Sequence, residues 1–308
     1  MEIIVNTSDF YLEKETAVAM GKFDGVHIGH RRLLSEILEQ KKNGLLACVF
    51  TFEPAPAVLF GKSDGGELTT REEKRLIFER MGVDILIEFP LTWESAAMEP
   101  ETFVRQVLKG QMNAQFIAAG TDLSFGAGGR GNAALLSALS EELAFKVKVI
   151  EKVCIEEREV SSTYIRTLLE QGAMKQVESF LGMPYMIVGN VMHGNQIGRT
   201  LGFPTVNQIP KESKLLPPFG VYYSRVLWRG REYRAISNVG CKPTVTDEHV
   251  CGVESYLYDF DEEIYGENIE VYLCEFKRAE RQFSSLEELK RQLMEDIEAG
   301  KHYGSIGL

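Results

Sequence analysis

The first half of the chain alternates short apolar runs with longer stretches in which apolar residues recur every three or four positions. Short apolar runs are typical of buried strands and the longer periodic stretches of amphipathic helices, so this alternation predicts an α/β fold with a parallel sheet covered by helices. Ligands of such doubly wound sheets bind at the carboxyl ends of the strands. The predicted strands are 16–20, 45–52, 85–89, 115–119 and 146–150, and the predicted helices are 30–42, 71–82, 100–111 and 132–144.

The second half has a different hydrophobic pattern, with short runs rich in Val, Ile and Tyr that are interrupted by Gly and Pro. Several short strands separated by turn signals predict a small β-barrel. A last helix is predicted at 286–299, where Ser285 and Glu288 have the spacing of a capping box. The predicted barrel strands are 185–192, 221–228, 233–239, 253–260 and 269–276.

The best boundary between the two patterns is Gly182-Met183-Pro184. Glycine ends the preceding helix and proline prevents its continuation. A chain of 308 residues suits two domains of ordinary size. We therefore predict a first domain at 1–184 and a second at 185–308.

Composition and charge narrow the class of protein. The chain is 44% hydrophobic and 26% charged, and no apolar run approaches the ~18 residues that a membrane span needs. The N-terminus lacks the basic flank and apolar core of a signal peptide, so we expect a cytoplasmic protein without a membrane partner. A net charge of −11 argues against a nucleic-acid surface but allows a nucleotide substrate. Nothing in the sequence marks a partner protein.

The five cysteines are odd in number, scattered, and without the Cys-x-x-Cys spacing of a zinc site. This pattern predicts reduced thiols in preference to disulfides. The cysteines are Cys48, Cys154, Cys241, Cys251 and Cys274.

The run of residues 21–30 joins the first predicted strand to the first predicted helix, and it contains two histidines. Backbone amides at such a helix start can face a phosphate. His27 and His30, three residues apart, can lie on one side of the first turn and donate hydrogen bonds to a transferring phosphoryl group. Alternatively, the two histidines could bind a metal ion, although the sequence shows no evident cluster that would supply further ligands. They could also be two ordinary surface histidines. The run reads Gly21-Lys22-Phe23-Asp24-Gly25-Val26-His27-Ile28-Gly29-His30.

Two further segments of the first half could bind a ligand. Asp122 lies in a glycine-rich loop after the fourth strand, where it could accept hydrogen bonds from a polar ligand or cap the turn. Ser161, Ser162 and Thr163 supply hydroxyls at a helix start, with Arg166 on its first turn. Arginine and helix amides together suit a triphosphate, whereas the alternative is an N-cap beside a solvated arginine.

In the second half, Thr205 and Asn207 are two residues apart, so in an extended segment they point to the same face and could share a metal ion or a phosphate. Glu254 opens a predicted strand, and its carboxylate could take a proton from an attacking hydroxyl. Alone, Glu254 would read as an ordinary surface acid.

Taken in order, these motifs resemble the bacterial family of bifunctional riboflavin kinase/FMN adenylyltransferases, also called FAD synthetases. The resemblance covers nearly the whole chain. It implies a Rossmann-like nucleotidyltransferase domain followed by a small β-barrel riboflavin kinase domain with a C-terminal helix. It rests on the run at 21–30 and on Ser161-Ser162-Thr163-x-Ile165-Arg166, Gly198-Arg199-x-x-Gly202-Phe203-Pro204-Thr205-x-Asn207, Pro218-x-Gly220-Val221-Tyr222, Asn238-Val239-Gly240-x-x-Pro243-Thr244 and Tyr265-Gly266.

The resemblance implies two sequential reactions with Mg²⁺. The barrel would transfer the γ-phosphate of ATP to riboflavin, giving FMN, and the first domain would join AMP from a second ATP to FMN, giving FAD and pyrophosphate. It implies that Glu254 is the base in the kinase and that Thr205 and Asn207 organise Mg²⁺ and the nucleotide phosphates. It also implies that His27 and His30 contact the α-phosphate and that Ser162, Thr163 and Arg166 hold the triphosphate. Asp122 would contact the flavin. The other implied nucleotide-binding residues are Gly21, Phe23, Asp24, Gly29, Gly198 and Arg199.

The chain departs from the family at several positions. Ala55 stands where the family has a histidine, Leu123 and Ser124 replace a Phe and often an Arg, and Tyr256 replaces a common His. Since three of these positions touch the adenylyltransferase site, we predict that synthesis of FAD is weaker, or more dependent on conditions, than synthesis of FMN. Two alternatives are a kinase with an impaired first domain and a regulatory protein that binds flavin or nucleotide without turnover.

Overall fold

The computed structural model describes residues 1–61, 66–193, 202–243, 249–301 and 303. The chain divides into two compact units. The first unit comprises Met1–Gly65 and Lys74–Ser161, and the second comprises Gly66–Glu73 and Ser162–Leu308. The short segment Gly66–Glu73 thus belongs to the same unit as the C-terminal half of the chain.

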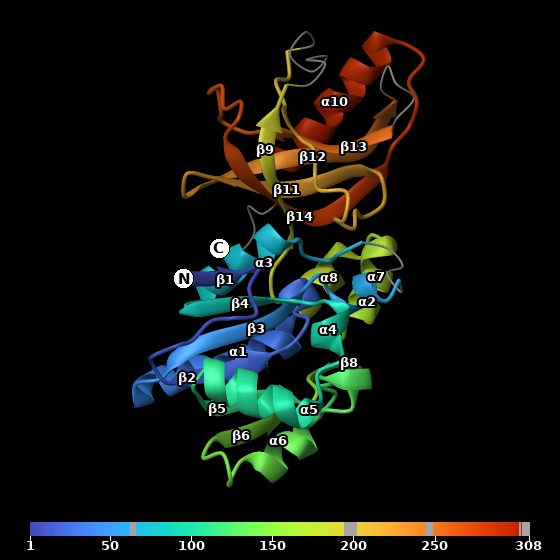
Figure 1. Ribbon diagram of the computed structural model, residues 1–308. Helices are drawn as coiled ribbons and strands as arrows, with labels where there is room; N and C mark the ends of the chain where they lie inside the picture. Colours follow the sequence, from blue (N-terminus) through green and yellow to red (C-terminus); the bar gives the residue numbers. More distant parts are fainter. Residues whose placement is uncertain (62–65, 194–201, 244–248, 302, 304–308) are drawn as a thin grey trace. The chain divides into compact units, whose positions relative to one another are not determined.

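The first unit contains a six-stranded parallel sheet in the order β1-β4-β3-β2-β5-β6 (Figure 1). This confirms the predicted parallel sheet, to which the structure adds the short first strand. The strands are β1 (Glu2–Val5), β2 (Thr16–Met20), β3 (Leu46–Glu53), β4 (Ile85–Pro90), β5 (Ala114–Gly120) and β6 (Lys146–Ile150).

Helices connect these strands close to the predicted positions. Helix α3 starts at a capping box, because the Glu73 N–H donates to Thr70 Oγ1 (3.3 Å) and the Thr70 N–H donates to Glu73 Oε2 (2.9 Å). The sequence Thr69-Thr70-Arg71-Glu72-Glu73 offers two capping-box registers, and the structure uses the one that pairs Thr70 with Glu73. The helices are η1 (Asp24–Val26), α1 (Ile28–Glu39), η2 (Gln40–Asn43), α2 (Pro56–Leu59), α3 (Arg71–Met81), α4 (Trp93–Ala96), α5 (Pro100–Thr102), the π-helix η3 (Phe103–Gln111), η4 (Ala127–Gly129) and α6 (Ala133–Leu139).

Strand β2 is buried along its whole length, because both faces of the sheet are covered. On α1, Leu34 and Ile37 are fully buried, and each such side chain contributes roughly 1.5–3 kcal/mol. Phe50 of β3 packs against Phe103 of η3, with ring centroids 5.4 Å apart. This packing fixes the carboxyl end of β2 in the middle of the sheet.

The chain reverses its direction across the sheet between β2 and β5. From β2 it continues to β3 and β4 on one side, and from β5 it continues to β6 on the other. The loops that leave β2 and β5 at such a switch point diverge and leave a crevice at the carboxyl ends of the strands. Gly21 follows β2 there, and Thr121 follows β5.

The second unit contains a closed antiparallel barrel in the order β10-β13-β12-β11-β14-β9, which confirms the predicted barrel (Figure 1). The three-residue strand β10 was not predicted. Gly182 ends α8 in the left-handed conformation, and the domain boundary at Pro184 stays a prediction. The elements are α7 (Ser162–Glu170), α8 (Met174–Leu181), β9 (Tyr185–Met192), β10 (Val206–Gln208), β11 (Gly220–Trp228), β12 (Arg231–Pro243), β13 (His249–Leu257), β14 (Asn268–Ala279) and α10 (Leu286–Lys301); the hairpin β7 (Cys154–Ile155) and β8 (Arg158–Glu159) precedes them in the first unit.

Helix α10 confirms the predicted C-terminal helix, and it packs on the outside of the barrel. Ile297 contacts Val221, Ile236 and Tyr258 in one buried cluster. The Tyr258 hydroxyl also donates to the Ile297 carbonyl (2.5 Å). At the other edge of the helix, Arg278 Nη2 of β14 donates to Oδ2 of the buried Asp296 (2.5 Å).

A disulfide joins Cys241 of β12 to Cys251 of β13. The prediction that the thiols are reduced is therefore wrong for this pair. The two residues stand directly opposite each other in the β12–β13 register, a relationship that cysteine spacing alone does not reveal. The cysteines Cys48, Cys154 and Cys274 are free, as predicted.

Candidate active sites

The loop that follows β2 is tightly packed. The Gly21 N–H donates to the Phe50 carbonyl (3.2 Å), which ties the loop to β3. A Cβ at Gly21 would lie 3.2 Å from the Phe23 ring, so the ring position requires a small residue there. Phe23 itself is fully buried and takes the left-handed backbone conformation (φ 51°). Two of the predicted nucleotide residues thus shape the loop.

His27 and His30 lie together at the start of α1, as predicted, whereas their role towards a phosphate stays a prediction. His27 caps the helix, because its Nδ1 accepts the His30 N–H (3.2 Å). The two rings are stacked, with centroids 3.6 Å apart and planes inclined by 10°. A Cβ at Gly29 would lie 3.1 Å from His27 Nδ1, so glycine allows the imidazole to fold back over the helix start.

Both imidazoles are neutral near pH 7. Burial lowers the pKa of His27 to about 4, although the carboxylates of Asp24 and Asp122 oppose the shift. Burial and the adjacent His27 hold the pKa of His30 well below its usual value. Because His27 Nδ1 accepts a hydrogen bond, the proton of the neutral ring is on Nε2. His27 is therefore an uncharged hydrogen-bond donor.

Asp122 follows β5 across the switch point from the histidines, and its charge acts on the pKa of His27. Its Oδ2 lies 3.7 Å from Lys152 Nζ, and its side chain is 72% exposed. The structure thus places Asp122 near His27, at the carboxyl edge of the sheet.

Part of the glycine-rich loop beyond Asp122 has a packing role. A Cβ at Gly131 would lie 2.5 Å from the buried Phe125 ring. Leu123 packs against the hydrophobic core, and the Ser124 hydroxyl donates to the Gly129 carbonyl (3.1 Å). The glycines therefore permit close packing, in addition to any part they have in binding.

Ser162 and Thr163 begin helix α7, as predicted, and Arg166 lies one turn further on. Arg166 Nη1 donates to the Gly66 carbonyl (2.5 Å). These residues belong to the second unit, whereas the histidine pair belongs to the first.

The barrel brings Asn207 and Glu254 together. Asn207 of β10 stands directly opposite Glu254 of β13, and Thr205 precedes Asn207 by two residues. On its other side, Glu254 is opposite Asn238 of β12, whose Nδ2 donates to Glu280 Oε1 (2.9 Å). Directly opposed residues share one face of a sheet, so Asn207, Glu254 and Asn238 form a polar row.

Asn238 had no predicted role, although it belongs to the Asn238-Val239-Gly240 motif, which was the available signal. The predicted nucleotide residues Gly198 and Arg199 lie outside the described residues.

The sequence analysis also did not single out an exposed aromatic pair, Phe60 and Trp93. Phe60 follows α2 and Trp93 starts α4, so both come after the carboxyl ends of neighbouring strands, β3 and β4. Their rings meet edge to face, with centroids 5.5 Å apart, and remain 45% and 69% exposed. Large aromatic side chains in water-facing loops after strands were the available signal, and such rings can pack against a flat ligand.

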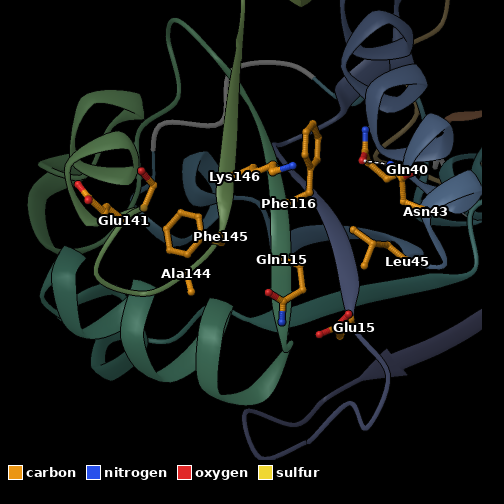
Figure 2. Close-up of a pocket in the computed structure, with 11 residues that line it drawn as sticks. Glu15, Gln40, Asn43, Leu45, Gln115, Phe116, Glu141, Ala144, Phe145 and Lys146 are labelled. Carbon is orange, nitrogen blue, oxygen red and sulfur yellow. Dashed lines mark hydrogen bonds between the residues drawn. The ribbon is translucent and has the colours of Figure 1, made fainter.

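A shallow concavity of about 530 Å³ lies at the opposite edge of the sheet. Figure 2 shows Glu15, Leu45 and Lys146 around it, and these residues stand at the amino ends of β2, β3 and β6. Because ligands of parallel sheets bind at the carboxyl ends, we do not assign the nucleotide to this concavity.

Within the described parts of the chain, no helix is both long and apolar enough to cross a membrane. The same residues contain no group of three or more His, Cys, Asp or Glu side chains that could hold a metal ion.

Comparison with known proteins matches each half of the chain to a family. Residues 11–164 match the FAD synthetase family, and residues 181–303 match the riboflavin kinase family. The bifunctional riboflavin kinase/FMN adenylyltransferase of Bacillus subtilis is 33% identical over 99% of both chains. The enzyme of the same description from Escherichia coli K12 is 36% identical over 91% of this chain and 90% of its own length.

A solved structure also resembles the whole chain. The crystal structure described as a macrolide-efflux protein from Streptococcus pneumoniae aligns with a TM-score of 0.86 and 30% identity over 98% of each chain. The two-part fold is therefore shared with that protein over nearly the whole of both chains.

Proposed function

The chain belongs to the bifunctional riboflavin kinase/FMN adenylyltransferase family, and on this basis we propose that it phosphorylates riboflavin to FMN and adenylylates FMN to FAD. We further propose that residues 1–184 form the adenylyltransferase domain and residues 185–308 the kinase domain. The family matches support this division, since one ends at residue 164 and the other begins at residue 181.

The pairing of Asn207 with Glu254 carries the kinase assignment. The Glu254 carboxylate accepts the proton of the riboflavin 5′-hydroxyl as that oxygen attacks the γ-phosphorus of ATP. The new P–O bond forms as the bond to the β–γ bridging oxygen breaks, and ADP leaves with the electron pair. In this proposal Gly198 and Arg199 contact the nucleotide.

Thr205 and Asn207 have the right chemistry for Mg²⁺, because a hydroxyl and an amide carbonyl are the oxygen ligands that this hard cation prefers. When bound, Mg²⁺ supplies positive charge beside the phosphates of ATP. The protein side chains orient the nucleotide and receive the proton.

The stacked pair His27 and His30 carries the adenylyltransferase assignment. A phosphate oxygen of FMN attacks the α-phosphorus of ATP, the bond to the α–β bridging oxygen breaks, and pyrophosphate leaves. His27 donates from Nε2 to the charge that develops on the α-phosphate, which needs no protonated imidazole. Catalysis by positioning and charge stabilisation is usual for phosphoryl transfer.

The remaining residues of the first proposed domain bind substrate. Gly21, Phe23, Asp24 and Gly29 shape the nucleotide loop, and Asp122 accepts hydrogen bonds from the flavin. Ser162, Thr163 and Arg166 hold the triphosphate. We also propose a cytoplasmic enzyme of flavins and ATP that requires no nucleic acid, membrane or partner protein, in keeping with its net charge of −11.

A second candidate is a riboflavin kinase with an impaired adenylyltransferase domain. Ala55 favours it, because an alanine at the end of β3 cannot donate the hydrogen bond that a histidine would supply.

Glu254→Gln tests the proposal, with the exposed Glu262→Gln as the matched control. We expect Glu254→Gln to slow FMN formation from riboflavin by roughly 10²–10⁴-fold and to leave FAD formation from FMN unchanged. His27→Asn should slow only the second reaction. Equal loss of both activities in either variant would contradict the assignment of two separate sites.

A further inference from the structure

A carboxylate from another part of the barrel reaches the polar row of the proposed kinase site. Asn238 Nδ2 of β12 donates to Glu280 Oε1 (2.9 Å), across 42 positions of sequence. Glu280 directly follows β14, which is separated from β12 by β11. The Glu280 N–H donates to the carbonyl of Phe219, just before β11 (3.2 Å). The chain that leaves β14 is thus tied to the start of β11, and the Glu280 side chain extends to β12.

Gly240 leaves room for this carboxylate. It lies two residues after Asn238, so the two positions share one face of β12. A Cβ at Gly240 would collide with Glu280 Oε1 and lie 2.8 Å from Glu280 Cδ. The backbone at Gly240 is not in the left-handed region, so its conformation does not require glycine. The glycine of the Asn238-Val239-Gly240 motif therefore serves to seat the Glu280 carboxylate.

The hydrogen bond from Asn238 to Glu280 fixes the direction of the Asn238 amide. An ionised carboxylate only accepts hydrogen bonds, so the NH₂ end of the amide faces it and one of the two N–H donors is engaged. Asn238 stands directly opposite Glu254, and opposed side chains have Cβ atoms about 4.5–5.5 Å apart. A group bound to the Glu254 carboxylate is therefore within reach of the second N–H of Asn238.

Glu254 lies between two asparagines in the sheet. Asn207 of β10 is its neighbour on one side, and Asn238 of β12 is its neighbour on the other. In the proposed function Asn207 is assigned to Mg²⁺ and the phosphates of ATP. The side of Glu254 that carries Asn238 is therefore available for the other reactant, the riboflavin hydroxyl.

The attacking hydroxyl has a lone pair for such a donor. Its oxygen carries one proton, which passes to Glu254, and two lone pairs. One lone pair forms the bond to the γ-phosphorus as the bond to the β–γ bridging oxygen breaks and ADP leaves. The other lone pair accepts the second N–H of Asn238, which aligns the oxygen for attack.

We propose that Glu280 is a positioning residue of the riboflavin kinase, an inference that rests on the proposed function of the barrel. It holds the Asn238 amide beside Glu254, and Asn238 binds the riboflavin hydroxyl that Glu254 deprotonates. Glu280 acts through Asn238 and takes no proton from the substrate.

The test uses the full chain and riboflavin phosphorylation at varied riboflavin and varied ATP. Glu280→Met keeps a side chain of similar length without the acceptor, so we expect kcat/KM for riboflavin to fall about tenfold, as for the loss of one hydrogen bond. The KM for ATP should not change. Glu280→Gln retains an oxygen that accepts from Asn238 and should lower kcat/KM less. The matched control, Glu295→Met at an exposed position of α10, should leave both quantities unchanged.

A double-mutant cycle separates positioning from a general structural role. In an Asn238→Ala background, Glu280→Met should have no further effect on kcat/KM for riboflavin, because the amide that Glu280 orients is gone. Gly240→Ala should reproduce the effect of Glu280→Met, since its methyl group displaces the carboxylate. Its control is Gly189→Ala, where a Cβ would lie 3.6 Å from Gln208 Nε2, an ordinary contact.

Three results would overturn the inference. They are an unchanged kcat/KM for riboflavin in Glu280→Met, an equal loss with and without Asn238, and a rise in the KM for ATP. Because Glu280 is exposed, Glu280→Met should also keep the melting temperature of the parent chain and its rate of FAD formation from FMN. A lower melting temperature with loss of both activities would show a structural role and overturn the inference as well.

Failure of the proposed function has a different signature. A parent chain that converts no riboflavin to FMN would refute the kinase assignment. Riboflavin binding, followed by the change in its fluorescence, then tests the inference. Weaker binding by Glu280→Met, with no such effect in the Asn238→Ala background, would support it, and equal binding by all the chains would refute it.

Discussion

Glu73 and Lys214 form a buried ion pair between residues 141 positions apart, with Lys214 Nζ 2.7 Å from Glu73 Oε2 and side chains 1% and 0% exposed. Both partners make further contacts. The Val188 N–H donates to Glu73 Oε1 (3.1 Å), and Lys214 Nζ lies 4.1 Å above the Tyr185 ring. The pair therefore anchors the segment Gly66–Glu73 within the second unit.

Breaking this pair from one side should destabilise the protein strongly. Glu73→Gln or Lys214→Met alone is expected to lower the free energy of unfolding by about 3–5 kcal/mol, because a buried charge loses its partner. The double variant should lose less than the sum of the two, since neither charge remains. Urea denaturation of the four chains gives the coupling energy; strictly additive losses would show that the two side chains do not interact.

His27 should make stability depend on pH. Its pKa is about 4 in the folded chain and about 6.5 in the unfolded chain, so between these values the unfolded state binds more protons. Stability from this group is complete above pH 6.5 and is lost as pH falls, by about 2 kcal/mol on reaching pH 5.

His27→Asn isolates that contribution, because asparagine retains a capping oxygen for α1 but does not titrate. We expect the loss of stability between pH 7 and pH 5, measured by urea denaturation, to be smaller in the variant. Since His30 is present in both chains, equal losses would mean that His27 titrates normally when folded.

Ala55 should limit the second reaction. It precedes α2 directly after β3, at the carboxyl edge of the sheet. We expect FMN adenylylation to be slower than riboflavin phosphorylation and Ala55→His to raise the adenylylation rate about tenfold, the equivalent of about 1.4 kcal/mol in the transition state. Initial rates from FMN and from riboflavin measure this. If the parent chain adenylylates FMN rapidly and Ala55→His gives no gain in rate, Ala55 does not limit the reaction.

The disulfide between Cys241 and Cys251 should be detectable in purified protein. Alkylation after denaturation without a reductant is expected to modify only Cys48, Cys154 and Cys274. Replacing both bonded cysteines with serine should lower stability by about 2–4 kcal/mol, by the usual effect of a cross-link on the unfolded chain. Modification of all five cysteines would show that the bond does not form.

The hydrophobic pattern of the sequence was sufficient to predict the longer strands and helices. The predicted strands at 16–20 and 146–150 coincide with β2 and β6, because a short apolar or alternating run between turn signals has few other interpretations. Strands β1 and β10 were missed, since four and three residues are too short to show a period. The disulfide was missed because it depends on the β12–β13 register.

In the candidate sites, too, the local arrangement could be predicted from the sequence and the long-range pairing could not. His27 and His30 could be paired from sequence, since their spacing fits one side of a helix start. The contact of Asn207 with Glu254 required strand pairing between residues far apart in the chain, although motif resemblance pointed to both.

The most direct test of the whole account is to incubate the purified chain with ATP and Mg²⁺ and either riboflavin or FMN, then separate the flavins by chromatography. The account predicts FAD from both starting flavins, with FMN accumulating when riboflavin is supplied. FMN without any FAD would confine activity to the barrel. Flavin binding with no ATP-dependent product would contradict the account and identify a regulatory binding protein.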